Sequence, residues 1–301
     1  MRFRLSHRTS YVYASPVDLA QHVLRLDARP LPTQRIDKVV VVCSPRPSRV
    51  SQTVDHFGNR ITHVALAGPH DRLDLTLEAS GEILPRTPPP PDATMPWEEV
   101  AAALLGDGFP TAVEASEFVH ASPRAAPLAS FSPFAQASFA GGRPILEAVL
   151  ELTHRIHEAY RYDPAATDVS TPLAEVVARR AGVCQDFAHL QIAGLRALGL
   201  AARYVSGYIA TRPVGAARPL RGADASHAWV SVWCGPRAGW IDVDPTNDLL
   251  VSDAHVVAAW GRDYGDVSPV RGVFVGGGAH SLSVAVDLEQ LGPSPPAAAQ
   301  D

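Results

Sequence analysis

Six prolines between residues 85 and 96 constrain the fold of this chain more than any other feature. Proline has no backbone N–H and a fixed φ, so neither a helix interior nor a central strand can run through such a segment. The hydrophobic pattern also changes there, from short strand-like runs to helical spacing. We therefore predict an N-terminal domain over residues 1–84, a stiff linker over 85–96, a second domain over 97–290 and a disordered tail over 291–301.

Residues 1–84 have the pattern of an antiparallel β-sandwich. Residues 38–43 read KVVVVC, a short β-branched run typical of a strand, and Leu73, Leu75 and Leu77 alternate with polar residues. The turn signal DHFGN at residues 55–59 separates two further strand-like runs, 49–54 and 60–66. Several short strands spaced by turns indicate a small sandwich.

The second domain combines helices and strands. Ile145, Val149, Leu152, Ile156 and Tyr160 follow the spacing of one helix face, and a further helix is expected from Cys184 to Leu198. Strands are expected at residues 202–209, 228–234 and 240–243. The sequence therefore predicts an α+β protein, with a cysteine-bearing helix packed on an antiparallel sheet.

Charge and cysteine content narrow the class of protein. The net charge of −5 provides no basic field for nucleic acid, and no apolar stretch has the length of a membrane helix. Three cysteines, Cys43, Cys184 and Cys234, favour a reducing compartment over a disulfide framework, and no CxxC spacing suggests zinc. The N-terminus lacks the apolar core of a signal peptide, so we expect a cytoplasmic protein without nucleic-acid or membrane partners.

Cys184 has the local setting of a nucleophile. It follows Gly182-Val183 at the expected start of a helix, where unpaired N–H groups and the helix dipole stabilise a thiolate. The same N–H groups can hold the oxyanion that forms when sulfur attacks a carbonyl. A buried structural cysteine is the alternative.

Two later segments provide a base and an acid. His227 leads into the strand SHAWVSVW, and a carboxylate follows in GWIDVDPTN. Adjacent antiparallel strands would bring His227 and Asp244 together, so that the carboxylate orients an imidazole that takes the thiol proton. Asp242 lies on the same strand face as Asp244, and periodicity does not choose between them.

These three segments resemble the core blocks of the transglutaminase-like superfamily. The resemblance rests on GVCQDFAHL, SHAWVSVW and GWIDVDPTN, in that order. The segments HRTSYVY, DHFGN and GRDYGDVSPVRGVFVGGG further resemble its bacterial branch, which carries an N-terminal β-sandwich. The resemblance implies a papain-like cysteine protease core with Cys184 as nucleophile, His227 as base and Asp244, the aspartate directly before Pro-Thr, as orienting acid.

The resemblance also implies an aromatic side chain upstream of the cysteine in the oxyanion site. No tryptophan stands there, so Tyr162 is the candidate and Tyr160 its rival. The triad supplies its own base, so neither a metal nor a cofactor is expected.

A Cys–His–Asp site forms an acyl-enzyme from an amide and passes the acyl group to water or to an amine. We expect hydrolysis of peptide or isopeptide bonds in a peptide or protein substrate, because the chain has no DxDxDG calcium loop and no second pair of C-terminal domains. Acyl transfer to an amine, as in a transglutaminase, is the alternative. A non-catalytic binding protein on the same fold is a further alternative.

The loop with Arg262, Asp263, Tyr264 and Asp266 follows the triad and admits two interpretations. It lines the substrate cleft, or it bridges the domains through charge pairs with the N-terminal sandwich.

Overall fold

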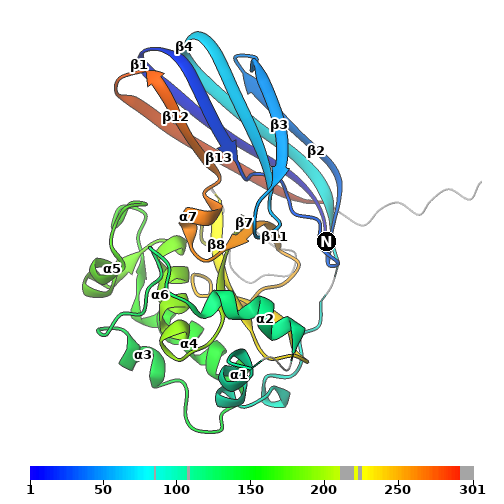
Figure 1. Cartoon of the computed structure of the whole chain (residues 1–301), viewed down its shortest axis with the longest axis vertical. Coiled ribbons are helices and arrows are strands. Elements are labelled where there is room, and N and C mark those ends of the chain that lie inside the picture. The colour runs from blue at the N-terminus through cyan, green and yellow to red at the C-terminus, as the bar shows by residue number, and fades with distance from the viewer. Residues whose placement is uncertain (85, 107–108, 211–219, 223–225, 292–301) are drawn as a thin grey trace, which may run out of the picture.

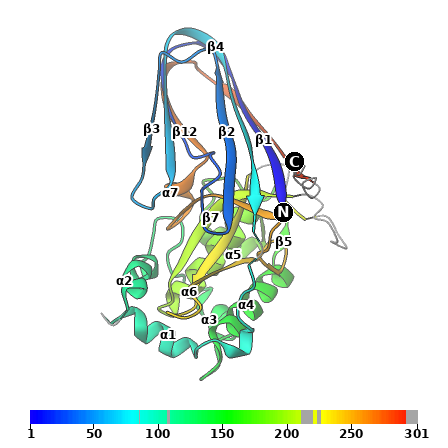
Figure 2. The ribbon, with the colours of Figure 1, turned by 90° about the vertical axis from the view of Figure 1, so that its right-hand side faces the viewer.

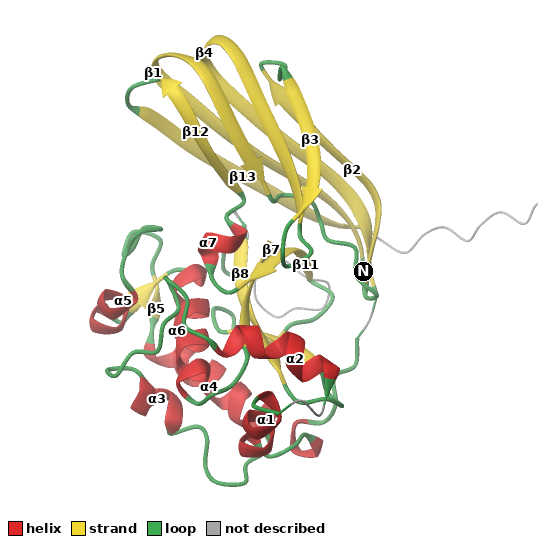
Figure 3. Ribbon diagram, in the orientation of Figure 1, coloured by secondary structure: helices red, strands yellow, loops and turns green. Residues whose placement is uncertain are grey.

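The computed structural model describes residues 1–84, 86–106, 109–210, 220–222 and 226–291. A strand-rich part lies above a part built from helices packed around a second sheet (Figures 1 and 3). The tail expected to be disordered lies, from residue 292 on, outside the described residues, as does Pro85. None of the described helices has both the length and the hydropathy needed to cross a membrane.

The upper part is an antiparallel arrangement of six strands. Its two longest strands, β1 (Arg2–Leu24) and β4 (Arg60–Ile83), pair with each other, with irregularities around residues 12–19. β2 (Gln34–Ser44) pairs with the later half of β4, whereas β3 (Arg49–Val54) pairs with its earlier half. Alternate side chains from both halves of β4 belong to one apolar core. The strands of this part confirm the expected strand-rich N-terminal region (Figure 2).

The last two strands of the chain also belong to this upper part. β13 (His280–Leu291) pairs with the first half of β1, and β12 (Val270–Gly276) pairs with its second half. Residues up to 290 were expected in the second domain, and the pairing of β12 and β13 with β1 corrects that boundary. Most side chains of β12 and β13 are exposed, so these strands add backbone hydrogen bonds along an edge and contribute little to the core.

The lower part surrounds a five-stranded antiparallel sheet of order β10-β9-β8-β7-β11. Its strands are β7 (Ala202–Ile209), β8 (His227–Trp233), β9 (Trp240–Asp244), β10 (Leu249–Leu250) and β11 (His255–Gly261). The helices are α1 (Trp97–Leu104), α2 (Pro110–Ser116), α3 (Ser132–Gln136), α4 (Ile145–Ala159), α5 (Leu173–Arg179), α6 (Cys184–Ala197) and α7 (Tyr264–Val267), with 3₁₀ turns η1 (Pro91–Ala93) and η2 (Glu117–Val119). Both helices expected from hydrophobic spacing are present, as α4 and α6.

Helix α6 is the centre of the lower part. Its buried residues pack on one face of β7 and β8, in a core that also includes Val230, Val232 and Val243. The opposite face of the sheet buries Val205, Trp229 and Val257. This arrangement confirms the predicted α+β class, with the cysteine helix on an antiparallel sheet.

The two parts share packing and hydrogen bonds along the edge strand β11. Gln34 exchanges side-chain hydrogen bonds with the N–H and C=O of Val257, and Asn59 does the same with Trp260. Tyr208 of β7 donates to the carbonyl of Leu26 and lies in the core of the upper part. Two amide side chains therefore replace a neighbouring strand and cover a sheet edge.

Candidate active site

Cys184 is the first residue of α6 and is half-buried. The preceding residue, Val183, has extended backbone geometry, and its N–H donates to the side chain of Asp186 at 2.9 Å. Asp186 also accepts from Thr167 at 2.6 Å, which holds the first turn in place. The N–H groups of Cys184 and Gln185, at the start of this turn, have no hydrogen-bond partner among the described residues.

His227 begins β8 and lies beside Asp244, the last residue of β9. Nε2 of His227 is 2.8 Å from Oδ2 of Asp244, and both side chains are fully buried. Burial lowers the pKa of His227, but the charges of Asp244 and Cys184 and the hydrogen bond with Asp244 outweigh it and raise the pKa to about 10. Cys184 is thus an electrostatic neighbour of the imidazole, and the three expected residues are brought together.

The two ring nitrogens of His227 have different surroundings. Nε2 donates to the carboxylate of Asp244, which only accepts. Nδ1 has no hydrogen-bond partner among the described residues, so it is the nitrogen left to exchange a proton with sulfur or substrate. The carboxylate therefore keeps a proton on Nε2 and fixes the orientation of the imidazole.

Asp244 is held by more groups than the sequence analysis identified. Its Oδ1 accepts from the N–H groups of Thr246 and Asn247, and its Oδ2 accepts from Asn247 Nδ2 at 2.8 Å and lies 3.3 Å from Nε2 of His255. Burial raises the pKa of a carboxyl, but the charge and hydrogen bond of His227, together with those of His255, hold the pKa of Asp244 well below its usual range. Asp244 is therefore ionised at neutral pH.

Asn247 and His255 are the functional residues that sequence reasoning missed. Asn247 is the last residue of GWIDVDPTN, and its place three residues after Asp244 is the available signal. Its side chain also exchanges hydrogen bonds with the backbone of Arg221, which fastens that loop beside the triad. His255 comes from β11, two strands away from His227, and nothing in the sequence pattern singled it out.

Tyr162 lies close to the triad, whereas Tyr160 does not. Tyr162 is in β5 (Arg161–Tyr162), which pairs in parallel with β6 (Ala181–Gly182), so it is opposite Gly182, two residues before Cys184. A Cβ atom on Gly222 would lie 2.8 Å from Nδ1 of His227 and 3.5 Å from the hydroxyl of Tyr162. Both groups thus face the same small space. Tyr160 is 5% exposed and packs edge-on against the ring of Phe187 in the core.

Asp242 occupies a different environment from Asp244. Its Oδ2 accepts from the indole N–H of Trp229 at 3.0 Å, and no hydrogen bond or ion pair joins it to His227 in the described part of the chain. Trp229 in turn stacks on His227 with ring centroids 6.3 Å apart. Asp242 therefore positions a neighbour of the imidazole and does not orient the imidazole itself.

The other two cysteines lie away from the triad. Cys43 is in β2 of the upper part, and burial raises its pKa to about 11. Cys234 follows β8 and is buried, and burial raises its pKa to about 12. Both thiols stay protonated at neutral pH.

Three of the side-chain atoms in the site have a geometry that a metal ion could use. Ligand atoms of His227, Asp244 and His255 lie within 4.8 Å of one another, and all three residues are buried. The distances of 2.8 Å and 3.3 Å from the imidazoles to the carboxylate are those of hydrogen bonds, which account for this cluster without an ion.

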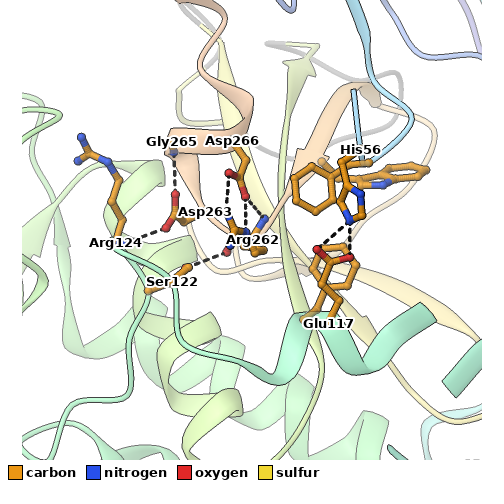
Figure 4. A network of polar contacts seen from close by, with 12 residues as sticks. His56, Glu117, Ser122, Arg124, Arg262, Asp263, Gly265 and Asp266 are labelled. Carbon is orange, nitrogen blue, oxygen red and sulfur yellow. Dashed lines mark hydrogen bonds and ion pairs between the residues drawn. The ribbon is translucent and has the colours of Figure 1, made fainter. Parts of the chain in front are cut away.

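The loop after β11 makes several polar contacts with the rest of the lower part. Asp263 caps α7 through the N–H of Gly265 and accepts from the backbone N–H of Arg124, while Arg262 pairs with Asp266 (Figure 4). His56 of the upper part contacts Glu117 of η2 at 2.9 Å in the same region. Asp263 and Asp266 have their partners within the lower part, so these two carboxylates do not make the charge pairs with the N-terminal sandwich that one interpretation expected.

Comparisons with known proteins agree with this geometry. A family model described as the transglutaminase-like superfamily matches residues 133–245, and one described as the bacterial transglutaminase-like N-terminal region matches residues 3–82. The first match contains Cys184, His227 and Asp244. The resemblance inferred from the sequence is thereby confirmed.

Similar proteins match nearly the whole chain. An uncharacterised protein of Mycobacterium tuberculosis is 37% identical over 297 residues, which cover 95% of this chain and 92% of that protein. A protein-glutamine gamma-glutamyltransferase of Pseudomonas aeruginosa is 34% identical over 130 residues, 42% of this chain and 19% of that protein. Among solved structures, a candidate cysteine protease of Cytophaga hutchinsonii has a TM-score of 0.75 at 21% identity, covering 98% of this chain and 92% of that one.

Proposed function

We propose that this chain, which belongs to the transglutaminase-like superfamily, is a thiol enzyme that hydrolyses peptide or isopeptide amide bonds through Cys184, His227 and Asp244. The observation that carries the proposal is the buried His227–Asp244 pair beside a cysteine at a helix N-terminus. Nucleophile, base and orienting acid are then present in one place. A peptide or protein is the proposed substrate.

The raised pKa of His227 keeps the imidazole protonated at neutral pH, ready to donate a proton. The thiolate of Cys184 attacks the carbonyl carbon, and the imidazolium donates its proton to the departing amine as the C–N bond breaks. A thioester remains on Cys184. Water then attacks the thioester, its proton passes to His227, and the acid leaves as the sulfur is released. Asp244 stays ionised and holds the imidazole throughout.

The oxyanion that forms in each attack is held by donors at the start of α6. The N–H groups of Cys184 and Gln185 have no hydrogen-bond partner among the described residues, whereas those of Asp186 and Phe187 donate to the carbonyl of Val183. We propose that the hydroxyl of Tyr162 adds a side-chain donor, because it faces the same space as Nδ1 of His227. This reaction needs no metal and no cofactor.

Acyl transfer to an amine is the second candidate function. It is favoured by the similarity between part of this chain, 42% of its length, and a protein-glutamine gamma-glutamyltransferase. The acyl-enzyme is common to both reactions, and the acceptor of the acyl group distinguishes them.

Differential alkylation tests the assignment of the nucleophile. We expect iodoacetamide at pH 6.5 to modify Cys184 well before Cys43 or Cys234, since burial keeps those two thiols protonated. Peptide mapping by mass spectrometry gives the order of labelling. Faster labelling of Cys43 or Cys234 would contradict the assignment.

Product analysis tests the reaction. The protein is incubated with a peptide library and a fluorescent primary amine, and products are separated by mass. New carboxyl termini, or glutamine converted to glutamate, support hydrolysis, whereas incorporated amine supports acyl transfer. Cys184→Ala should abolish both, and Cys43→Ala should preserve them. If the wild-type protein has a reactive Cys184 and yet gives neither product, that outcome favours a binding protein on this fold.

A further inference from the structure

A cavity of about 640 Å³ lies on the face of the central sheet opposite α6. It is bounded by β9, β10 and β11, by the segment before β2, and by the end of β4 with the linker that follows. Its volume is within the range of small-molecule sites. The wall is mostly apolar and aromatic, and Arg203, Asp242 and His255 supply its central polar groups.

Arg203 of β7 is held flat in this cavity between two indole rings. Its guanidinium carbon lies 4.2 Å from the ring centroid of Trp240 and 3.8 Å from that of Trp260. The Nε atom is buried without a hydrogen-bond partner, and the guanidinium donates to no other described residue. Burial lowers the pKa of Arg203 to about 10, partly offset by the charge of Asp242, so the group is still cationic at neutral pH.

Arg196, a buried arginine of the lower part, has all three guanidinium nitrogens hydrogen-bonded. The guanidinium of Arg196 donates to five acceptors, four backbone carbonyls and the hydroxyl of Ser122. Arg29, which stacks on the other side of Trp260, donates to Asn59. The Arg203 side chain is partly buried and its Nε is enclosed, so an acceptor that enters the cavity would satisfy donors that make no hydrogen bond within the described residues.

The hydrogen-bonding capacity left in the cavity is mainly that of a donor. Oδ2 of Asp242 already accepts from Trp229, and Asp253 lies 3.8 Å from the N-terminal amine. His255 is 2% exposed, and its Nδ1 has no partner among the described residues, while its Nε2 faces Asp244. The unused fork of Arg203 matches a carboxylate, which accepts in a planar, bidentate manner.

We propose that this cavity binds an organic carboxylate, with the acid group on Arg203 and an apolar body against Trp240, Trp260 and the neighbouring aliphatic side chains. The site is separate from the proposed chemistry at Cys184 and goes beyond it. A free small acid and the C-terminus of a peptide share this chemistry. His255 lines the cavity and contacts Asp244, so a bound carboxylate would be separated from Asp244 by one side chain.

Direct binding tests the proposal, using full-length protein whose Cys184 has been blocked with iodoacetamide. Benzoate and hexanoate are titrated by calorimetry and by tryptophan fluorescence, because Trp240 and Trp260 line the site. We expect saturable binding, with benzamide at least tenfold weaker because it lacks the charge. A peptide with a free C-terminus that outcompetes benzoate, when its amidated form does not, identifies the peptide source.

Variants locate the site. Arg203→Gln should weaken benzoate binding by tenfold or more, and Arg203→Lys should give an intermediate loss because it keeps charge without the fork. Arg271→Gln, at an exposed position on β12, is the matched control and should bind as the wild type does. Equal affinity for benzoate and benzamide, or undiminished binding by folded Arg203→Gln, would overturn the proposal. The benzoate–benzamide comparison decides the matter even where the variants do not fold.

Discussion

At the scale of single residues, the structure separates two aspartates that share a strand face. Asp244 accepts hydrogen bonds from two imidazoles, an amide and two backbone N–H groups, whereas Asp242 accepts from one indole. The difference arises because β9 ends at Asp244, where the chain turns through Thr246 and Asn247. A strand end offers backbone donors that a mid-strand position does not.

We therefore expect Asp244→Asn to slow acylation by roughly 10²–10⁴ while the fold is kept, because an amide no longer selects the imidazole tautomer. Asp242→Asn should lose much less, since Trp229 still has an acceptor. Single-turnover acylation by an activated ester measures both rates, with circular dichroism as the check on folding.

His227→Ala should be at least as damaging as Asp244→Asn, because it removes the base. A folded Asp242→Asn protein that is slower than Asp244→Asn would contradict the triad proposed above.

At the scale of elements, the start of α6 depends on the absence of a side chain at Gly182. A Cβ atom there would lie 2.5 Å from Oδ2 of Asp186, the carboxylate that accepts from Val183. That carboxylate anchors the turn which carries Cys184. The parallel pairing of β5 with β6 adds Tyr162 to the same turn.

Gly182→Ala should therefore displace Asp186 and lower the free energy of unfolding by about 1–2 kcal/mol, the usual cost of a lost helix cap. Thiol reactivity of Cys184 should fall with it. Urea unfolding and the rate of alkylation measure the two effects.

Gly141→Ala is the matched control, because its new Cβ would meet only Glu98, at 3.8 Å. Equal stability of the two variants would show that the contact at Gly182 is readily relieved.

At the scale of the whole molecule, the last two strands of the sequence, β12 and β13, complete the sheet that β1 begins. Residue 2 pairs with residue 291, so the last strand returns to the first across the length of the sequence. Leu282, Val284, Val286 and Leu288 do alternate, which is a strand signal, but alternation does not identify the partner strand.

A fragment of residues 1–84 should accordingly fail to fold, since β1 would expose its whole outer edge. Joining residues 269–291 through a short linker to the N-terminus of that fragment should restore a folded domain. Amide chemical-shift dispersion measures folding in each, and a well-dispersed spectrum from residues 1–84 alone would contradict this expectation.

His7 makes the junction between the two parts sensitive to acid. It is 1% exposed, contacts Thr9 at 2.9 Å and meets the ring of Tyr208 edge-on at 5.6 Å. Burial lowers its pKa from 6.5 to about 4. Between those values only the unfolded chain takes up the proton. The contribution of the neutral His7 to the free energy of unfolding is therefore fully present above pH 6.5 and is lost as the pH falls to 4.

The loss should reach about 3 kcal/mol for this histidine. His7→Gln should flatten the dependence of unfolding free energy on pH between 6.5 and 4, whereas His120→Gln, at an exposed position, should leave it unchanged. Denaturant unfolding at a series of pH values measures both slopes, and parallel slopes for His7→Gln and wild type would count against the assignment.

The sequence by itself determined the local features: the cysteine at a helix start, the histidine leading a strand and the aspartate before Pro-Thr. These depend on neighbours a few residues away, whose spacing and propensities can be read directly. Only the tertiary structure decided the place of β12 and β13, the approach of Tyr162 rather than Tyr160, and the contact of His255 with Asp244. Each of these joins segments by strand pairing or packing between distant elements, and a periodic pattern states which face a residue occupies without stating what lies opposite.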